Sequence, residues 1–340
     1  MRRKTELLCY FCIAFFLGVY FLLISYKDTT SKDNISIKKN SLNVATVQTY
    51  DSSKKLVTMP FSKVPEKVII NRINGAETLM ALGVENRIIA INMQNTDWGK
   101  PYDDRYIDKG KDLEKITYRD LTKEEAILLN PDCIIGWYST FMDKRLGTTG
   151  FWNSRQVSTY IQSTSNMVKP QAGVRDECKF IEDMGLIFHS EEKAKILIDA
   201  IWEKIRYIQE KTKESYHPVV MVIEFSGNGL ITYGYEWLVG DMIRQLGGSI
   251  PCKSGQISYE ELIEINPDVI FVVYFNSDLE SVMSQYFSNP AFASLRATQN
   301  LRVVPLRLDY MYTTGVRTIN GLKMLAKGMY PGIQGLDDEI

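Results

Sequence analysis

A phrase that occurs twice constrains the fold of this chain more than any other feature. "LNPDCIIGWYS" occupies residues 129–139 and "INPDVIFVVYF" occupies residues 265–275. In each copy the proline ends a helix, because it removes a backbone donor and disfavours helix in the residue before it. The aspartate then begins a turn into an apolar strand. One unit of helix, stop and buried strand in each half predicts two lobes on one plan, as the length of 340 residues also favours.

Strands and helices alternate around both copies. Short apolar runs separated by helical periods are typical of parallel strands buried on both faces. After a strand, turn and strand over 44–60, we expect strands at 67–71, 87–93, 132–137, 218–225 and 268–275, and helices at 75–83, 122–130, 236–248 and 259–266. Residues 176–215 are strongly helical, with Ile196, Ile201, Ile205 and Ile208 at helix spacing. The fold class is therefore α/β: two Rossmann-like lobes with mostly parallel sheets, joined by a long rigid helix.

The N-terminal segment predicts attachment to a membrane. Arg2, Arg3 and Lys4 precede an uncharged stretch of 20 residues (7–26), which is long enough to cross the hydrocarbon core with the N-terminus in the cytoplasm. No small-x-small cleavage site follows, which favours an uncleaved anchor over a removed signal. The expected parts are the basic end and transmembrane anchor or signal (1–26), a polar tether (27–44), the N-terminal lobe (45–175), the helical connector (176–215), the C-terminal lobe (216–333) and a tail (334–340).

Composition excludes several kinds of partner and cofactor. The 40 basic and 41 acidic residues are mixed along the chain, so no nucleic-acid partner is expected. With two histidines and three single cysteines in the soluble part, we expect no metal site and no cofactor. The chain has neither a G-x-G-x-x-G after its first strand nor a Walker phosphate loop. An enzyme is the disfavoured alternative, with Asp97, Asp103 and Asp104 as its acidic cluster.

Several longer stretches carry a family resemblance. They are "VPEKVIINRINGAETLMALGVENRIIAIN" (64–92), "EEAILLNPDCIIGW" (124–137), "LVGDMIRQLGG" (238–248), "ISYEELIEINPDVIFV" (257–272) and "GLKMLAKGMYP" (321–331). With the helical connector, they make the chain, over about residues 45–333, resemble the substrate-binding proteins of ABC importers for iron–siderophore complexes, haem and cobalamin. The resemblance implies an extracytoplasmic protein that captures an iron complex between its lobes and delivers it to a permease and ATPase.

Two glutamates match a further element of that resemblance. Glu124 and Glu260 each precede a Pro-Asp step by seven residues. The resemblance implies that they dock onto arginines of the permease, and the pairing of a carboxylate with arginine is directional. The alternative is that each is an early helical glutamate favoured by the helix dipole.

A ligand is expected between the lobes, outside the carboxyl ends of the strands. Residues just after predicted strands, or before a helix, are the candidate contacts: Arg72, Trp98, Tyr118, Trp137, Tyr138, Tyr235, Trp237, Tyr310 and Arg317. The resemblance to cobalamin-binding relatives implies cleft positions for Tyr118 and Trp137. Aromatic faces suit a conjugated or catecholate-bearing ligand, and the arginines suit carboxylate or catecholate charge.

The identity of the ligand stays open at this stage. A ferric siderophore supplies its own oxygen ligands to iron and so fits a histidine-poor chain best. Haem is an alternative, with Met311 as the candidate iron ligand. Cobalamin is another, as is an oxyanion such as molybdate, which would need a narrow site with converging donors. A sensor ectodomain of the same fold is the alternative to import.

Overall fold

The computed structural model describes residues 44–92, 104–106, 108, 120–227, 229–275 and 279–337. The predicted membrane-spanning segment 7–26 and the tether up to residue 43 lie outside these residues. Within the described part, no helix has both the length and the apolar character needed to span a membrane.

The N-terminal lobe begins with an antiparallel hairpin and continues as a parallel sheet. The hairpin strands are β1 (Ala45–Tyr50) and β2 (Leu56–Phe61). The sheet has the order β4-β3-β5-β6, with all neighbours parallel. Its strands are β3 (Val68–Asn71), β4 (Ile88–Asn92), β5 (Cys133–Gly136) and β6 (Ser158–Ile161). The parallel strands predicted from the apolar runs are thus present, with both faces covered.

The first two helices of this lobe lie close to their predicted positions, and the third was not predicted. They are α2 (Ile73–Leu82), α4 (Lys123–Leu129) and α5 (Thr149–Asn153), with 3-10 helices η1 (Glu85–Arg87), η2 (Asp104–Tyr106) and η3 (Tyr138–Phe141). Helix α2 ends at Gly83, whose φ of 76° places it in the left-handed region that glycine adopts without strain.

The C-terminal lobe contains a five-stranded sheet of order β11-β10-β7-β8-β9. Its strands are β7 (Val220–Ser226), β8 (Gly229–Thr232), β9 (Gly255–Ile257), β10 (Val269–Tyr274) and β11 (Val303–Arg307). Strands β7, β10 and β11 are parallel, whereas β8 and β9 are antiparallel to their neighbours. Residues 229–232, which lie between the predicted strand 218–225 and the predicted helix 236–248, form strand β8.

The helices of the C-terminal lobe cover both faces of that sheet. They are α8 (Leu238–Gln245), α9 (Tyr259–Ile265), α10 (Leu279–Phe287), α11 (Arg296–Gln299) and α12 (Thr318–Met329). Short 3-10 helices lie at η4 (Pro290–Phe292), η5 (Leu308–Tyr310) and η6 (Gly315–Arg317). The last two lie in the loop 308–318, which approaches the N-terminal lobe.

The connector consists of two helices, α6 (Val174–Ile187) and α7 (Glu191–Thr212), where one long helix was expected. The chain breaks between them at His189, whose φ is 54°. Ile201, Ile205 and Ile208 are buried, but Ile196 is 67% exposed. Five residues, or about 140° around the helix axis, separate Ile196 from Ile201, so the two cannot share one face.

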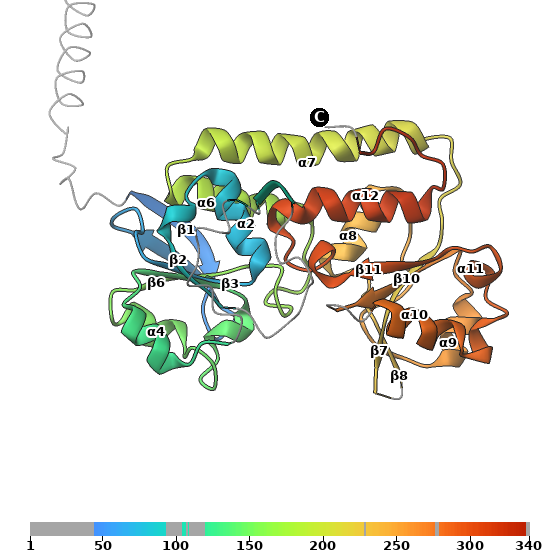
Figure 1. Ribbon diagram of the computed structural model, residues 1–340, viewed down its shortest axis with the longest axis horizontal. Helices are drawn as coiled ribbons and strands as arrows, with labels where there is room; N and C mark the ends of the chain where they lie inside the picture. The colour runs from blue at the N-terminus through green and yellow to red at the C-terminus, as the bar shows by residue number, and fades with distance from the viewer. Residues whose placement is uncertain are drawn as a thin grey trace, which may run out of the picture. The chain divides into compact units, whose positions relative to one another are not determined.

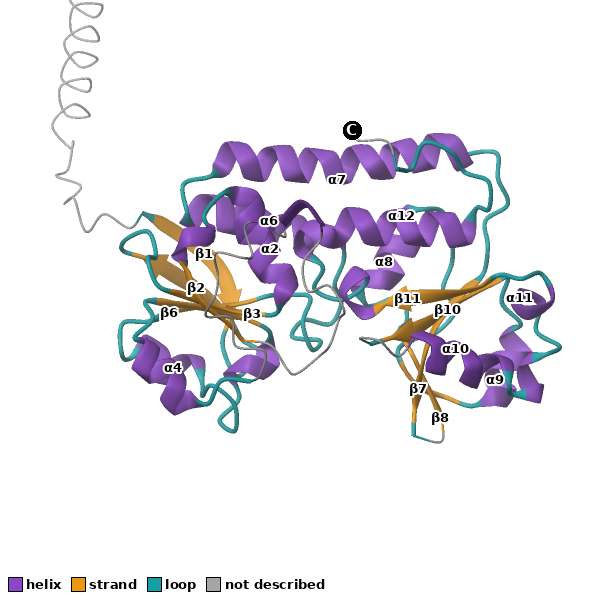
Figure 2. Ribbon diagram, in the orientation of Figure 1, coloured by secondary structure: helices purple, strands orange, loops and turns teal. Residues whose placement is uncertain are grey.

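A layer of helices joins the two lobes. Helix α7 packs against α2 and α6 of the first lobe and against α12 of the second, as Figures 1 and 2 show. One apolar cluster in this layer contains Leu79 and Ile181 together with Met242 and Leu325. The opposite faces of the two sheets have separate cores. The lobes therefore share a core on the side of α7, whereas α4 and α9 lie on the side away from it (Figure 1).

Candidate functional site

The repeated phrase forms the same local structure in both lobes. In α4 the hydroxyl of Thr122 accepts from the backbone N–H of Glu125 at 3.2 Å, and in α9 Ser258 accepts from Glu261 at 3.1 Å. Each glutamate side chain in turn accepts from the backbone N–H of its capping residue. These reciprocal bonds are capping boxes, which satisfy two of the free donors at a helix start. Both helices are therefore fixed at the end that carries Glu124 or Glu260.

The Asn-Pro-Asp step does more than end the helix. Asn130 and Asn266 adopt left-handed backbone with φ of 51° and 44°, which closes each helix before the proline. The carboxylate of Asp132 accepts from the N–H groups of Glu66 and Lys67, and Asp268 accepts from Val219. Each aspartate thus fixes the chain leading into the neighbouring strand, β3 or β7. The unit holds the helix and the strand end in a set geometry.

Glu124 and Glu260 are both solvent-accessible on these helices. Each is the second residue of its helix, next to the glutamate of the capping box. The helices that carry them, α4 and α9, lie on the side away from α7 (Figure 1). The docking role of both glutamates stays a prediction.

Four aromatic rings form a continuous series between the lobes. Trp137 follows β5 of the first lobe, and its ring centroid lies 4.9 Å from that of Tyr312. Tyr312 lies 5.2 Å from Trp237, which lies 5.5 Å from Tyr233. The guanidinium of Arg72 lies 4.6 Å from the centroid of the Trp137 ring. The structure therefore brings together Arg72, Trp137, Tyr233, Trp237 and Tyr312, all of which follow strands, and we call these five residues the inter-lobe aromatic series.

The polar groups of the series differ in their hydrogen-bond partners. The backbone N–H of Asn166 donates to the Tyr312 hydroxyl, and burial raises the pKa of Tyr312 to about 12. The Tyr233 hydroxyl donates to Glu224, a carboxyl whose pKa burial raises. Among the described residues, the buried indole N–H of Trp237 has no acceptor. A buried donor without a partner is costly, so this N–H is available to a ligand acceptor.

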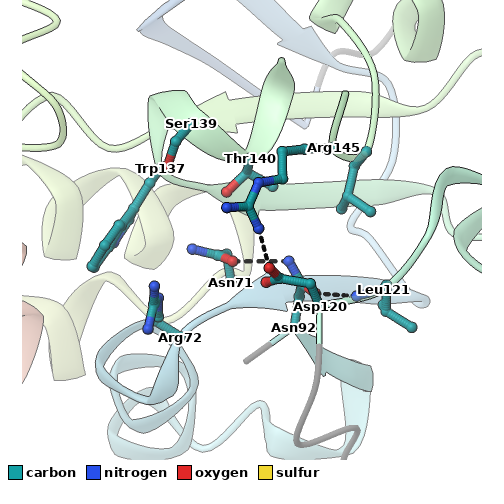
Figure 3. Close-up of a pocket in the computed structure, with 10 residues that line it drawn as sticks. Asn71, Arg72, Asn92, Asp120, Leu121, Trp137, Ser139, Thr140 and Arg145 are labelled. Atoms are coloured by element: carbon teal, nitrogen blue, oxygen red, sulfur yellow. Dashed lines mark hydrogen bonds and ion pairs between the residues drawn. The ribbon is translucent and has the colours of Figure 1, made fainter. Parts of the chain in front are cut away.

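A small polar cavity lies at the carboxyl ends of β3, β4 and β5 (Figure 3). Asn92 donates to Asn71 at 3.0 Å and accepts from the N–H of Leu121 at 2.6 Å, while Arg145 pairs with Asp120. The cavity of about 30 Å³ is lined by Asn71, Arg72, Asn92, Asp120, Leu121, Trp137, Ser139, Thr140, Arg145 and Leu146. Asp120 and Arg145 were not predicted, because neither directly follows a predicted strand.

A second cavity, of about 20 Å³, lies between the lobes against Arg72, Trp137, Leu308 and Tyr312. Cavities of these sizes hold one water or a few. The rings of Trp137 and Tyr312 border the second cavity directly.

Arg72 has a backbone conformation that is rare for a residue with a side chain. Its φ of 71° and ψ of 156° fall in a region populated almost only by glycine. Its N–H donates to the carbonyl of Asn92 at 2.9 Å, which keeps β3 and β4 joined at this point. Burial lowers the pKa of the guanidinium, and the nearby carboxylate of Asp120 opposes that shift. Strain retained at a strand end of this kind is typical of functional positions.

Comparing two substitutions at Arg72 tests the strain. Arg72→Gly and Arg72→Ala both remove the guanidinium, but only glycine relieves the backbone. We expect Arg72→Gly to be more stable than Arg72→Ala by about 1–3 kcal/mol in urea unfolding. At an unstrained position glycine is the less stable of the two by roughly 0.5–1 kcal/mol. Alanine equal to or better than glycine would contradict the strain.

Other predicted ligand residues lie away from the series. The Tyr138 hydroxyl donates to the carbonyl of Ser52 at 3.2 Å, beside the β1–β2 turn. Tyr235 is exposed, and the ring of Tyr310 lies 4.9 Å from the guanidinium of Arg307. None of the three lines either cavity. Trp98 and Tyr118 lie outside the described residues.

Arg317 has a different environment from the one expected. Its side chain is 3% exposed, and its guanidinium donates to both carboxylate oxygens of Glu77 at 2.6 and 2.7 Å and also to Asp309. Glu77 belongs to α2 of the first lobe and Arg317 to η6 of the second. We therefore assign Arg317 to the packing of the lobes against each other rather than to a ligand surface. Met311, the candidate haem ligand, lies buried in the shared core.

Further hydrogen bonds fix the same loop, residues 308–318, to the first lobe. The Asn74 amide donates to the carbonyls of Asp309 and Thr313 at 3.1 Å each. The N–H of Gly315 donates to Glu177 at 2.6 Å, and that of Val316 donates to Thr78 at 3.3 Å. Because Tyr312 lies in this loop, the packing of the lobes also positions the centre of the aromatic series.

The raised pKa of the buried Glu177 carboxyl predicts that the free energy of unfolding depends on pH. Burial raises its pKa to about 7 from a usual value of 4.5, against the opposing effect of its bonds from Thr164 and Gly315. The folded state thus binds the proton more tightly than the unfolded state. The contribution of Glu177 to the free energy of unfolding is complete below about pH 4.5 and is lost as pH rises through about 7. We expect unfolding free energy to fall by about 3 kcal/mol from pH 4.5 to 8 on this account.

Glu177→Gln isolates that contribution, because glutamine cannot titrate. Urea unfolding of both proteins at several pH values should show a shallower slope for the variant between pH 5 and 8. Identical slopes would contradict the raised pKa.

Within the described residues, no group of three or more histidine, cysteine, aspartate or glutamate side chains is placed to hold a metal ion.

Comparison with known proteins identifies the fold. The model of the periplasmic binding protein family matches residues 73–310, well over half of the chain. The chain belongs to this family. The matched region runs from α2 to η5 and so contains most of both lobes of this periplasmic binding protein.

Three relatives show how far the similarity extends. A Bacillus subtilis protein described as an uncharacterized ABC transporter substrate-binding lipoprotein is 22% identical, over 88% of this chain and 90% of its own length. A periplasmic binding protein from Veillonella parvula is 28% identical with a TM-score of 0.74, covering 85% of this chain and 92% of that one. A structure from Saccharomonospora viridis, described as an ABC-type Fe3+-hydroxamate transport system, has a TM-score of 0.69 at 15% identity. Its coverage is 84% and 99%, and it supports the fold alone.

Proposed function

We propose that this chain is the extracytoplasmic substrate-binding component of an ABC importer and that it captures a ferric siderophore between its lobes. The observation that carries the proposal is the inter-lobe aromatic series, in which rings from both lobes and the guanidinium of Arg72 meet. The family membership, the Bacillus subtilis relative and the Fe3+-hydroxamate transport protein of Saccharomonospora viridis support the same class.

The chemistry of the series suits a large, partly conjugated chelate with anionic oxygens. Ring faces of Trp137, Trp237 and Tyr312 offer broad apolar contact, and Arg72 offers charge-assisted donors. The unpartnered N–H of Trp237 can donate to a hydroxamate, catecholate or carboxylate oxygen. Since the rings now contact one another, they must separate when a chelate enters. Ring–ligand contacts then replace ring–ring contacts, and tryptophan fluorescence should change.

An oxyanion is the second candidate, because the polar cavity brings Arg72 and Arg145 to one small space. The carboxylate of Asp120, which pairs with Arg145 in that cavity, opposes the binding of an anion. Haem ligated by Met311 is disfavoured, because that side chain is buried in the shared core. A ferric chelate needs no ligand from the protein and is favoured over both.

The proposal includes a path from capture to delivery. Segment 7–26 anchors the chain, the tether extends the lobes outside the membrane, and Glu124 and Glu260 dock onto the permease. The function consists of binding and release, with no chemical step on the ligand. The lipoprotein description of the Bacillus subtilis relative supports attachment to a membrane surface.

Substitution at Trp137 tests the binding surface. Tryptophan emission is followed while ferric hydroxamate or ferric catecholate siderophores are added. We expect Trp137→Ala to weaken binding at least tenfold, or about 1.4 kcal/mol, because a ring that contacts the ligand directly is lost. Trp137→Phe keeps a ring and should retain most of the affinity.

Trp202→Phe is the matched control, because Trp202 packs in the helical layer near Arg175, away from the series. Its affinity should equal that of the unmodified protein. If Trp137→Ala bound a siderophore as tightly as the control, the aromatic series would not be the binding surface.

A further inference from the structure

The two helices that we propose dock onto the permease, α4 and α9, have related sequences. They differ at one exposed position, which is apolar in α4 and acidic in α9. Residues 122–128 read Thr-Lys-Glu-Glu-Ala-Ile-Leu, and residues 258–264 read Ser-Tyr-Glu-Glu-Leu-Ile-Glu. Both begin with a capping box, carry the docking glutamate second and an exposed isoleucine fifth. At the sixth helical position α4 has Leu128, whereas α9 has Glu264. The two ends of the molecule thus present related but unequal surfaces.

The surface of α4 combines one carboxylate with apolar side chains. Leu128 is 84% exposed and Ile127 is 44% exposed. Leu128 lies four residues after Glu124, so the two share a face of the helix. The ammonium of Lys123 lies 5.1 Å from the ring centroid of Phe151. We call Glu124, Ile127 and Leu128 the apolar docking face.

The surface of α9 is acidic instead. Glu260 and Glu264 are both exposed and lie four residues apart, with Ile263, 39% exposed, beside them. No ion pair between described residues involves either glutamate. The neighbouring Tyr259 packs edge-on against Phe292, where α4 has its lysine over Phe151. We call Glu260, Ile263 and Glu264 the acidic docking face.

Each face carries a feature that is unfavourable in the free protein. A nearly fully exposed leucine leaves apolar area in water, at about 25 cal/mol per Å². Two carboxylates four residues apart repel each other and destabilise a helix by a few tenths of a kcal/mol. A partner with an apolar socket opposite α4 and basic groups opposite α9 would relieve both. Both helices lie on the side away from α7, where one partner can reach them (Figure 1).

We propose that the permease distinguishes the lobes at these two faces and that Leu128 and Glu264 fix the orientation of docking. Opposite α4 the partner presents one basic group beside an apolar socket, and opposite α9 it presents two basic groups. This inference rests on the proposed function, because it assigns a partner to the same two helices. Complementary charge fixes orientation and suppresses the reversed arrangement, in which an unpaired carboxylate would meet the socket.

The test uses the full chain in proteoliposomes with its permease and ATPase. Stimulation of ATP hydrolysis is measured against the concentration of the chain. Leu128→Glu and Glu264→Leu should each raise the concentration for half-maximal stimulation at least about fivefold, as loss of a central interface residue does. Leu301→Glu is the matched control, because Leu301 is 89% exposed outside both faces. Its curve should equal that of the unmodified chain.

The combined variant, Leu128→Glu with Glu264→Leu, exchanges the exposed leucine and glutamate between α4 and α9. We expect it to stimulate better than either single variant, because the reversed arrangement again places the carboxylate opposite the basic groups and the leucine opposite the socket. Stimulation no better than that of the single variants would overturn the role of Leu128 and Glu264 in fixing the orientation. Normal stimulation by both single variants would also overturn the fixed orientation. If the double variant Glu124→Ala with Glu260→Ala then lost stimulation, docking through α4 and α9 would still be supported. If that alanine pair also stimulated normally, docking through α4 and α9 would fail as well.

Discussion

Replacing Glu77 with alanine should lower the free energy of unfolding by about 3–5 kcal/mol. The substitution leaves the guanidinium of Arg317 buried beside Asp309 without its bidentate partner from the first lobe. A buried guanidinium that loses one of its two carboxylate partners retains its desolvation cost, which is why this loss exceeds that of a surface ion pair. Urea unfolding at pH 7, followed by circular dichroism, measures the effect.

Two control variants distinguish the effect of the buried Arg317 charge from a general loss of stability. Glu66→Ala removes an exposed carboxylate that lies 3.7 Å from Arg87, and it should cost less than about 1 kcal/mol. Glu77→Leu combined with Arg317→Met removes both charges, and it should recover much of the loss. A loss below about 1 kcal/mol in Glu77→Ala would show that this pair does not hold the lobes.

Replacing Glu124 and Glu260 together with alanine should stop uptake and leave ligand binding intact. Each carboxylate is solvent-accessible at the start of a capped helix, so its removal changes a contact surface and not the fold. Loss of two charged anchors at opposite ends of one docking surface should weaken association by more than about tenfold. Uptake of radioactive iron carried by a siderophore that the protein binds measures delivery, and fluorescence titration measures capture.

The matched control replaces Glu203 and Glu280, which lie on α7 and α10 rather than on the docking helices. Their double alanine variant should import normally. Normal uptake by the Glu124 and Glu260 double variant would remove the docking role of α4 and α9.

Local sequence patterns predicted the elements around the two copies of the phrase, because the signals for helix stops and buried strands act over a few residues. Strands β6, β9 and β11 and helices α10 to α12 were not predicted. The repeated phrase identified both helix-to-strand units, and Gly83 identified the end of α2. Helices α6 and α7 were merged into one expected connector, because the break at His189 involves neither proline nor a glycine turn. Ser190 before the acidic pair Glu191 and Glu192 was the available signal for a new helix start.

The site was predicted less completely, because its contacts join residues that are distant in the chain. Arg317 was expected at a ligand surface, but its partner Glu77 lies 240 residues away. Nothing local to Arg317 distinguishes a guanidinium that faces a ligand from one that pairs with a buried carboxylate. Likewise, Tyr312 joins Trp137 to Trp237 only because the loop 308–318 packs against α2 and α6.

The central claim is that the inter-lobe aromatic series captures a ferric siderophore. Native mass spectrometry of the full chain in detergent, after incubation with ferric siderophores, haem, cobalamin and molybdate, tests it most directly. We expect a one-to-one complex with at least one ferric siderophore, weakened at least tenfold in Trp137→Ala and unchanged in Trp202→Phe. Binding of only haem, cobalamin or molybdate, or of no compound in the panel, would contradict the account.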